Sequence, residues 1–540
     1  MDEILKKIKT SDKSFFVGLA GPGTGKTHAF KNIIESDDYK GKNILILSFI
    51  KKLVNDLSKD FIDFKNVKVS TLHSFAMQEM KKIIGKIELD PILDKTISED
   101  CYFIENKKID YAEKFYNNNL NAKEEEFYKK RIEFYKHESG LYSFNSIIYS
   151  FNKFFSLPKN KSNIPEYDLI LIDEFQDFNE LELELIKLLN IRNKIVVVGD
   201  DNQSLYFFKN AKPKQIKDLY DDISTESFSL DYCYRCPRVI VDATNNLIEN
   251  AKRNGFLSER STKKFLYPEG RGDKDEISLK YEKIDFIPSV SGELLIYQLE
   301  KNIKEYIKEN GKNKRILIIS PFYLKQRIYD GLIKKGINIV EFELFSDEEC
   351  NNVKHKDLIE TFETLTIRKT DNFALRKIIF LYLNSDEIKE ILNKNKKIWS
   401  LLTEEVKLKI EKDIEIFKKV KRGNKLNNDD IIRFNNIFSL KKILSKLIKG
   451  FYPVMREAIE VEMTTLMSSK GLSVDFVCYV SIDDSEMIDD EIGDLTDHKI
   501  CEFLVGITRA KEKLILISLR DKNPKILEFI DKNYINKYEI

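Results

Sequence analysis

Residues 14–27 read Ser-Phe-Phe-Val-Gly-Leu-Ala-Gly-Pro-Gly-Thr-Gly-Lys-Thr, a stretch with an apolar run followed by a glycine-rich run. Its apolar first part, residues 14–19, predicts a buried strand, its glycine-rich second part predicts a loop, and residues 28–36 predict a helix. A strand, a glycine loop and a helix in this order are typical of a phosphate-binding loop, where backbone N–H groups converge on phosphate oxygens at a helix N-terminus. Lys26 would reach the outer phosphates, and the Thr27 hydroxyl would hold Mg2+. The residues expected around the nucleotide are Ala20, Gly21, Pro22, Gly23, Thr24, Gly25, Lys26 and Thr27.

Two more apolar stretches end in polar residues suited to the same site. Residues 167–172, YDLILI, have the continuous apolar character of a strand buried in a parallel sheet, and Asp173 and Glu174 follow directly. Residues 194–198 form a similar stretch that leads to Gln203. Because ligands bind at the carboxyl ends of parallel strands, Asp173 would hold Mg2+ through water, and Glu174 would orient and deprotonate the attacking water. The Gln203 amide would sense the γ-phosphate. The sequence therefore predicts an α/β nucleoside triphosphatase.

Further segments resemble, in order and along almost the whole chain, the motifs of superfamily 1 DNA helicases of the UvrD/Rep/PcrA type. These segments are residues 44–58, 70–75, 230–235, 316–327, 464–472 and 503–510. The resemblance implies that Tyr234 stacks on the base, that Arg235 and Arg509 contact the γ-phosphate as arginine fingers, and that Gly471 lines the nucleotide site. Lys26, Glu174, Gln203, Arg235 and Arg509 are thereby the expected catalytic residues.

The resemblance also implies an architecture of two RecA-like P-loop domains with parallel sheets, each carrying a mainly helical insertion. The expected first core comprises residues 1–72 and 168–231, with its insertion at 73–167, and the second core comprises 232–342 and 456–540, with its insertion at 343–455. Apolar residues recur at three- and four-residue spacing in 123–155, 355–382 and 405–420, which predicts helices whose apolar stripes pack in a core.

The activity implied by the resemblance is that of an ATP-dependent DNA helicase or translocase, which uses ATP and Mg2+ and moves 3'→5' on single-stranded DNA. A duplex with a single-stranded 3' tail is the expected substrate. Single-strand binding uses stacking side chains and backbone contacts. The matching positions are Phe49, His73, Tyr206, Phe208, Lys209 and Thr465. For each aromatic residue, burial in the core is the competing interpretation.

Several positions depart from the family pattern. Ser473 and Val474 stand where Glu and Phe are usual, so we expect no carboxylate contact to the nucleotide sugar. The expected second insertion is short, so duplex unwinding should be weak. With few residues after the last motif, we expect no fused nuclease of the RecB or AddA type. Two other functions remain open: an accessory subunit that serves a nuclease partner in a Gabija-type anti-phage defence system, and a scaffold that senses nucleotide and DNA with little turnover. The sequence does not decide between DNA repair and antiviral defence.

The composition of the chain restricts how it can bind DNA and in which compartment it can act. Lys and Arg number 90 and Asp and Glu 89, which gives a formal net charge of +1, so DNA binding must come from a local groove. The sequence contains no apolar run of the roughly 18 to 20 residues that cross a bilayer, and six scattered cysteines suit a reducing cytoplasm. Cys233 and Cys236 have zinc-like spacing but no second pair nearby, so we expect no metal there.

Family members usually carry an adenine-reading glutamine just before the phosphate loop, whereas the first glutamine here is Gln78. We therefore expect poor discrimination among nucleotides.

Overall fold

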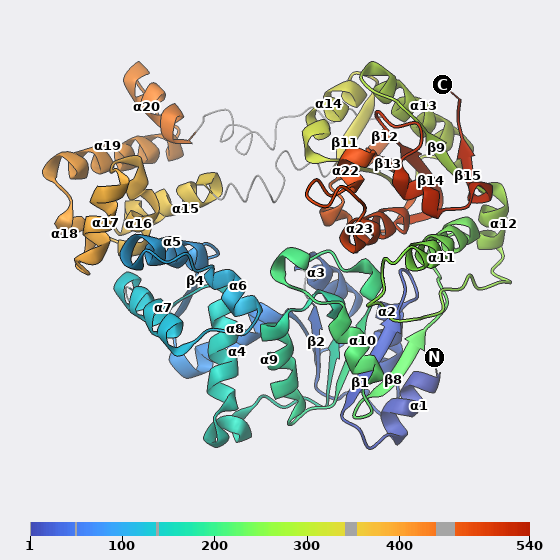
Figure 1. Ribbon diagram of the computed structural model, residues 1–540, viewed down its shortest axis with the longest axis horizontal. Helices are drawn as coiled ribbons and strands as arrows, with labels where there is room; N and C mark the ends of the chain where they lie inside the picture. Colours follow the sequence, from blue (N-terminus) through green and yellow to red (C-terminus); the bar gives the residue numbers. More distant parts are fainter. Residues whose placement is uncertain (1, 49–50, 137–139, 341–353, 439–458, 540) are drawn as a thin grey trace.

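Two parallel β-sheets organise the protein (Figure 1). The computed structural model describes residues 2–48, 51–136, 140–340, 354–438 and 459–539. Every strand pair within each of the two large sheets is parallel. The predicted α/β fold with two parallel sheets is confirmed.

The first sheet has six strands in the order β3-β2-β6-β7-β1-β8. Its strands are β1 (Phe15–Ala20), β2 (Ile44–Ser48), β3 (Val67–Thr71), β6 (Leu169–Ile172), β7 (Ile195–Gly199) and β8 (Glu226–Leu230). β1, β2, β6 and β7 are buried along their whole length, as their continuous apolar sequences predict. The helices of this part are α1 (Asp2–Thr10), α2 (Lys26–Glu35), α3 (Lys51–Asp60), α4 (Leu72–Ile84), α9 (Glu180–Asn190) and α10 (Lys214–Asp221).

The second sheet has seven strands in the order β11-β12-β10-β13-β14-β9-β15. Its strands are β9 (Ile284–Ile287), β10 (Ile316–Ile319), β11 (Ile337–Val340), β12 (Ile459–Thr464), β13 (Val474–Val480), β14 (Ala510–Ile517) and β15 (Ile535–Lys537). The accompanying helices are α11 (Arg238–Arg253), α12 (Asp273–Lys280), α13 (Glu293–Asn310), α14 (Phe322–Ile333), α22 (Asp484–Met487) and α23 (Asp497–Ile507). In both sheets, strands from distant parts of the chain are neighbours.

Mainly helical segments interrupt both sheets in sequence. The first contains α5 (Leu93–Glu105), α6 (Tyr111–Tyr116), α7 (Ala122–Tyr135) and α8 (Phe144–Ser156), with the short strands β4 (Ile87–Leu89) and β5 (Gly140–Tyr142). The second contains α15 (Lys354–Ile367), α16 (Asn372–Ile378), α17 (Ser385–Asn393), α18 (Ile398–Leu401), α19 (Glu404–Lys421) and α20 (Asn428–Phe438). The helices predicted from apolar spacing in both segments are confirmed.

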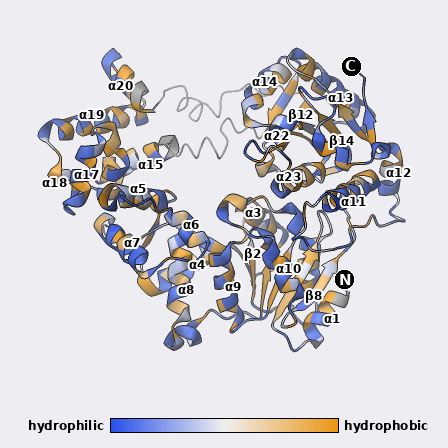
Figure 2. Ribbon diagram, in the orientation of Figure 1, coloured by the Kyte–Doolittle hydropathy of each residue, from blue (hydrophilic) through white to orange (hydrophobic). Residues whose placement is uncertain are grey.

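Apolar residues cover both faces of each sheet. Figure 2 shows hydrophobic residues concentrated on the strands, whereas hydrophobic and hydrophilic residues alternate along the helices. One hydrophobic cluster joins a face of the first sheet to both helical segments. The second helical segment therefore packs on the first one, and Arg376 of α16 donates to buried Asp100 of α5 at 2.7 Å.

The predicted division of the chain into cores and insertions agrees with where the strands lie. β1 to β3 lie within residues 1–72 and β6 to β8 within 168–231, while the second sheet draws its strands from 232–342 and 456–540. We keep the predicted boundaries, including insertions at 73–167 and 343–455, as a proposal that these placements support.

Candidate nucleotide site and nucleic-acid interface

The glycine loop between β1 and α2 has the backbone conformation that its sequence predicts. Gly23 and Gly25 have φ values of 68° and 87°, in the left-handed region that favours glycine. A Cβ atom on Gly23 would lie 2.3 Å from the Cβ of Arg235, so a side chain has no room there. The Tyr234 N–H donates to the Gly23 carbonyl at 2.8 Å. The loop is thus held directly against the segment that leads into the second sheet.

A cleft of about 380 Å³ lies above this loop, between the two sheets. Its lining residues are Pro22, Gly23, Thr24, Gly25, Lys26, Thr27, His28, Asp173, Glu174, Gln203, Tyr234, Arg235, Lys274, Lys470, Gly471, Ser473, Arg509 and Lys511. The structure therefore brings all five expected catalytic residues into one cavity. Of the expected nucleotide ligands, only Ala20 and Gly21 are outside this lining. Ala20 is the buried last residue of β1, and Gly21 accepts a hydrogen bond from the Thr24 hydroxyl at 2.9 Å.

Glu174 is held in a constrained position beside the loop. Its φ of 54° places a non-glycine residue in the left-handed region, which costs free energy and is typical of functional sites. The Lys26 ammonium lies 3.1 Å from one Glu174 carboxylate oxygen. The Gln176 amide donates to the other at 2.5 Å, and its carbonyl accepts from the Asp200 N–H at 2.9 Å. Gln176 thus ties the Glu174 side chain to the end of β7.

The neighbouring charges separate the two carboxylates chemically. Burial and the Glu174 charge raise the pKa of Asp173 to about 6, although Lys26 and Lys470 oppose the shift. Burial also acts to raise the pKa of Glu174, but the charges of Lys26 and Lys470 outweigh it and hold that pKa well below the usual range. Burial would lower the pKa of Lys26, but the carboxylates of Glu174, Asp173 and Asp200 raise it overall. At neutral pH, Glu174 is therefore a fully ionised carboxylate.

Gln203, which follows β7 of the first sheet, lies against two arginines in the cleft. The Gln203 amide donates to the Thr508 hydroxyl at 2.8 Å, and its carbonyl accepts from Arg509 at 3.4 Å. Arg235 donates to the Thr508 carbonyl at 3.3 Å. Burial, and then the nearby Arg235 charge, lower the pKa of Arg509 to about 9. Two guanidinium groups that repel each other in a buried cleft form a site suited to an anion such as a phosphate.

The side chains present fit a Mg2+ ion that shares its coordination with a nucleotide. Thr27 and Asp173 both line the cleft, and their oxygen atoms are of the type that Mg2+ prefers. Among the described residues, no group of three or more His, Cys, Asp or Glu side chains could hold a metal ion. The protein would thus supply few ligands, and phosphates and water would supply the rest, as is usual for Mg2+.

Lys470 is a central residue of the site that sequence reasoning missed. Its side chain is 2% exposed and forms an ion pair with Asp177. The Lys470 ammonium lies 3.8 Å from the Glu174 carboxylate and donates to the backbone carbonyl of Gln203 at 2.8 Å. Its ammonium also lies 5.6 Å from the centre of the Tyr206 ring. The available signal was its position within the 464–472 segment, directly before Gly471. The sequence does not reveal that its partners are almost 300 residues away.

A second connection between distant segments was also missed. Lys263 forms ion pairs with Asp200 and, at 2.6 Å, with Asp201, and all three side chains are buried. Burial acts to lower the pKa of Lys263, but the Asp200 and Asp201 carboxylates together outweigh it and raise that pKa. The Ser261 N–H also donates to Asp201 at 2.5 Å. The loop after β7 is therefore anchored to the segment between α11 and α12.

The described residues that are predicted to contact DNA differ in their exposure and surroundings. Phe208 is 64% exposed, and its ring centre lies 5.7 Å from that of the partly buried Tyr206. The Lys209 ammonium lies 5.7 Å from the Tyr206 ring centre. Thr465 directly follows β12, and its hydroxyl contacts the Ser468 hydroxyl at 3.3 Å. Phe49 lies outside the described residues. The exposure of Phe208 favours a surface role over burial in the core.

His73, at the start of α4, lies in a buried polar cluster with Glu182 and Lys209. The distance from His73 Nε2 to the Glu182 carboxylate is 3.6 Å. Burial, followed by the Lys209 charge, lowers the pKa of His73 to about 3, and burial raises the pKa of Glu182 to about 7 although Lys209 opposes this shift. His73 is therefore neutral at pH 7 and could contact a phosphate only as a neutral hydrogen-bond donor.

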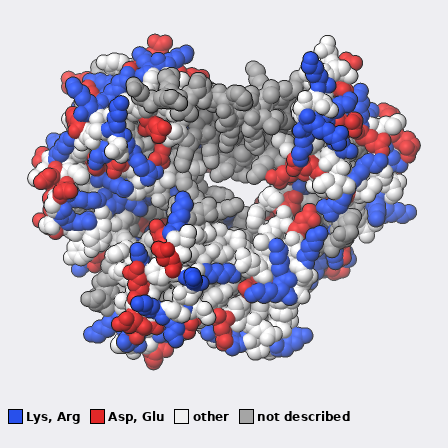
Figure 3. All heavy atoms as spheres, turned by 180° about the vertical axis from the view of Figure 1, so that it is seen from behind, with Lys and Arg blue, Asp and Glu red and all other residues white. Residues whose placement is uncertain are grey.

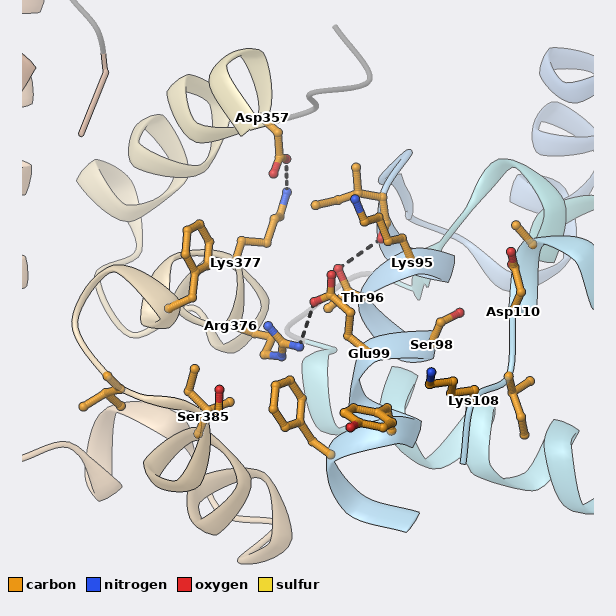
Figure 4. Close-up of a pocket in the computed structure, with 18 of the residues that line it drawn as sticks. Lys95, Thr96, Ser98, Glu99, Lys108, Asp110, Asp357, Arg376, Lys377 and Ser385 are labelled. Atoms are coloured by element: carbon orange, nitrogen blue, oxygen red, sulfur yellow. Dashed lines mark hydrogen bonds and ion pairs between the residues drawn. The ribbon is translucent and has the colours of Figure 1, made fainter. Parts of the chain in front are cut away.

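A larger cavity, of about 1190 Å³, lies between the two helical segments (Figure 4). Lys377 donates to Asp90 at 2.6 Å and to Asp357 at 2.7 Å across this region, and Arg376 lies 3.1 Å from Glu99.

Figure 3 shows basic and acidic side chains interspersed on one face of the described residues, in keeping with the near-zero net charge. None of the described helices is both long and apolar enough to cross a bilayer.

Comparisons with known proteins place the sequence among helicase relatives. A family described as "AAA domain" matches residues 4–209. The chain is 25% identical to the ATP-dependent DNA helicase Rep of Buchnera aphidicola subsp. Schizaphis graminum, over 92% of this chain and 90% of the relative. It is 25% identical to a probable DNA helicase II homolog of Mycoplasma capricolum, over 98% of this chain and 85% of the relative. It is 21% identical to the ATP-dependent DNA helicase PcrA of Staphylococcus aureus, over 51% of this chain and 44% of the relative.

Proposed function

Since the chain belongs to the UvrD/Rep/PcrA type of DNA helicases, we propose that it is an ATP-dependent DNA helicase that translocates 3'→5' on single-stranded DNA. One observation carries the motor assignment. Glu174 from the first sheet and Lys470 and Arg509 from the second line the same cleft, so hydrolysis there depends on how the two sheets are placed. ATP is the nucleotide named for the helicase relatives.

In this proposal the nucleotide lies between the two cores. Backbone N–H groups of residues 23–27 bind the phosphates, and the exposed ring of Tyr234 stacks on the base. Glu174 accepts a proton from a water molecule as that water attacks the γ-phosphorus, and the bond to the bridging oxygen of ADP breaks. Arg235 and Arg509 stabilise the negative charge on the γ-phosphate oxygens.

Thr27 and Asp173 would hold Mg2+ in the same cleft, which would neutralise phosphate charge during hydrolysis. The chain's own residues set the rest of the reaction. Gln176 fixes the direction of the Glu174 carboxylate, and Lys26 can reach both that carboxylate and the outer phosphates. Gln203 connects the γ-phosphate position to Thr508 and Arg509 of the second core.

Single-stranded DNA would cross both cores, with a single-stranded 3' tail as its loading site. Tyr206 and Phe208 offer stacking faces, and His73, Lys209 and Thr465 offer polar contacts to the backbone. Lys470 links this surface to catalysis because one ammonium group lies near both the Tyr206 ring and Glu174. DNA binding can thereby change the position of the catalytic carboxylate.

The free thiols of the described cysteines suit a reducing compartment, so we propose that the protein acts in the cytoplasm.

The function is tested by steady-state ATP hydrolysis with and without a single-stranded oligonucleotide. We expect slow turnover alone and strong stimulation by DNA, because DNA spanning both cores would bring the arginines to the nucleotide. Glu174→Gln should keep nucleotide and DNA binding but lower turnover by about two to four orders of magnitude. Lys26→Ala should instead weaken nucleotide binding, since it removes a positive charge from the phosphates.

Equal turnover with and without DNA would contradict a motor function. A wild-type protein that bound both ligands but hydrolysed no ATP would instead favour the nucleotide- and DNA-sensing scaffold. A Glu174→Gln variant with normal turnover would show that another group prepares the water.

A further inference from the structure

The pair Cys233 and Cys236 lies in the segment that joins β8 to α11, where the chain passes from the first sheet to the second. Both side chains are fully buried, and the two residues between them, Tyr234 and Arg235, line the nucleotide cleft. The Cys236 N–H donates to the Cys233 sulfur at 3.4 Å, so both side chains leave the same tight turn. The two cysteine side chains also contact each other.

Each thiol contacts a different side of the cleft. The Cys233 thiol donates to the carbonyl of Pro22, in the phosphate loop, at 3.2 Å. The Cys236 thiol lies 3.5 Å from the carbonyl of Thr508, the residue before Arg509. The pair therefore connects the loop of the first core to the arginine segment of the second.

The surroundings favour thiol chemistry over metal binding. Among the described residues, no third His, Cys, Asp or Glu completes a metal site with this pair. Contact with the Cys236 side chain, together with the backbone N–H groups of Cys236 and Arg235, lowers the pKa of Cys233 against the effect of burial. A thiolate is the reactive form in disulfide exchange, so Cys233 is the expected attacking group.

We propose that Cys233 and Cys236 are a redox-sensitive pair, and that a disulfide between them inhibits hydrolysis at the neighbouring nucleotide site. The inhibition rests on the proposed ATPase function. A disulfide removes the S–H donors that face Pro22 and Thr508. It also tightens the turn that carries Tyr234 and Arg235, and the Tyr234 N–H donates to the Gly23 carbonyl of the phosphate loop.

The oxidant in this proposal is a low-molecular-weight disulfide such as oxidised glutathione. The Cys233 thiolate attacks one of its sulfurs, the S–S bond breaks, and one small thiolate leaves. The Cys236 thiol then loses its proton, and its sulfur attacks the Cys233 sulfur and displaces the second small thiolate. Two protons are released by the protein, and two electrons pass to the oxidant. Because both thiols are buried, the oxidant reaches them only when the cleft opens, and a nucleotide that holds the cleft closed should slow this exchange.

The test uses the full chain with Cys350→Ser, because Cys350 lies outside the described residues and could form other disulfides. The protein is incubated with oxidised glutathione, with and without a non-hydrolysable ATP analogue and Mg2+, and is then blocked with an alkylating agent. Peptide mass spectrometry reports the Cys233–Cys236 bond, and DNA-stimulated ATP hydrolysis is measured on the same samples before and after reduction with dithiothreitol.

We expect the disulfide to form, the analogue to slow it, and ATP hydrolysis to fall by about tenfold or more, a barrier increase of about 1.4 kcal/mol, with recovery on reduction. Cys233→Ser keeps a hydroxyl donor facing Pro22 but removes the attacking thiol, so the exchange cannot begin at this position. Its activity, compared with its own reduced sample, should resist oxidant. Cys501→Ser removes another buried thiol, in α23, and should stay as sensitive as the parent.

The proposal is overturned if no Cys233–Cys236 bond forms, if the bond forms and leaves hydrolysis unchanged, or if Cys233→Ser is inhibited as strongly as the parent. A reduced protein without DNA-stimulated hydrolysis would contradict the proposed function instead. Disulfide mapping and its slowing by nucleotide would still test the pair, because neither readout requires turnover.

Discussion

Replacing Lys470 with Met should uncouple DNA binding from ATP hydrolysis. The change keeps the length of the side chain but removes the ammonium that pairs with Asp177, donates to the Gln203 carbonyl, and lies near both Glu174 and the Tyr206 ring. Glu174 keeps its stronger partner Lys26 and should stay ionised at pH 7. We therefore expect hydrolysis without DNA to be largely retained.

The cost in stability follows from the partners that remain. Asp177 already has a pKa raised to about 6 by burial, so protonating it at pH 7 costs at most about 1.4 kcal/mol. The lost hydrogen bond to Gln203 adds about 0.5 to 1.5 kcal/mol. The total of about 2 to 3 kcal/mol is below the 3 to 5 kcal/mol typical of an uncompensated buried charge, because Asp177 can take up a proton. Lys470→Met should therefore fold.

The assay compares steady-state hydrolysis with and without a single-stranded oligonucleotide, with DNA binding followed separately by fluorescence anisotropy. DNA stimulation should fall by about tenfold, or about 1.4 kcal/mol in the barrier. Lys470→Arg keeps the charge and should retain more of the stimulation. Lys274→Met serves as the matched control, because it removes another positive charge from the cleft. The Lys274 ammonium donates to the backbone carbonyls of Tyr234 and Arg235. Full DNA stimulation in Lys470→Met would refute the coupling role.

Two further predictions concern pH and nucleotide choice. The pKa of Glu182 rises from the usual 4.5 to about 7 in the folded protein, so stability should be lost as the pH rises through that interval. Glu182→Gln removes this titration, and its free energy of unfolding relative to the parent should increase by up to about 3 kcal/mol between pH 4.5 and 8 in denaturant titrations; a difference independent of pH would contradict the burial argument. Because the chain has no glutamine before Gln78, GTP and dATP should be hydrolysed within about tenfold of ATP in the presence of DNA. A preference for ATP of about a hundredfold would show that backbone groups read the base.

Elements with a strong local pattern were predictable from the sequence. Residues 14–19 were expected as a strand and β1 spans Phe15–Ala20, because an uninterrupted apolar run before a glycine loop leaves little choice of conformation. The cleft also contains most of the residues that the motifs indicated, since the carboxyl ends of parallel strands meet at one edge.

Contacts between distant segments were not predictable in the same way. The Lys470–Asp177 and Lys263–Asp200 pairs depend on how the two sheets are placed, and no local spacing records that placement. The packing of the second helical segment on the first, through Arg376 and Asp100, is also set by surface complementarity, which a helical apolar stripe does not specify. An apolar stripe predicts that a face is buried but not which partner buries it.

Whether ATP hydrolysis drives this chain along single-stranded DNA can be measured directly. The most direct measurement is strand separation of duplexes with a 3' tail, a 5' tail or blunt ends, by the parent protein and by Glu174→Gln. We predict ATP-dependent unwinding that needs the 3' tail, is weak because the second insertion is short, and is lost in Glu174→Gln. Unwinding that prefers a 5' tail, that proceeds efficiently from blunt ends, or that persists in Glu174→Gln would contradict the account.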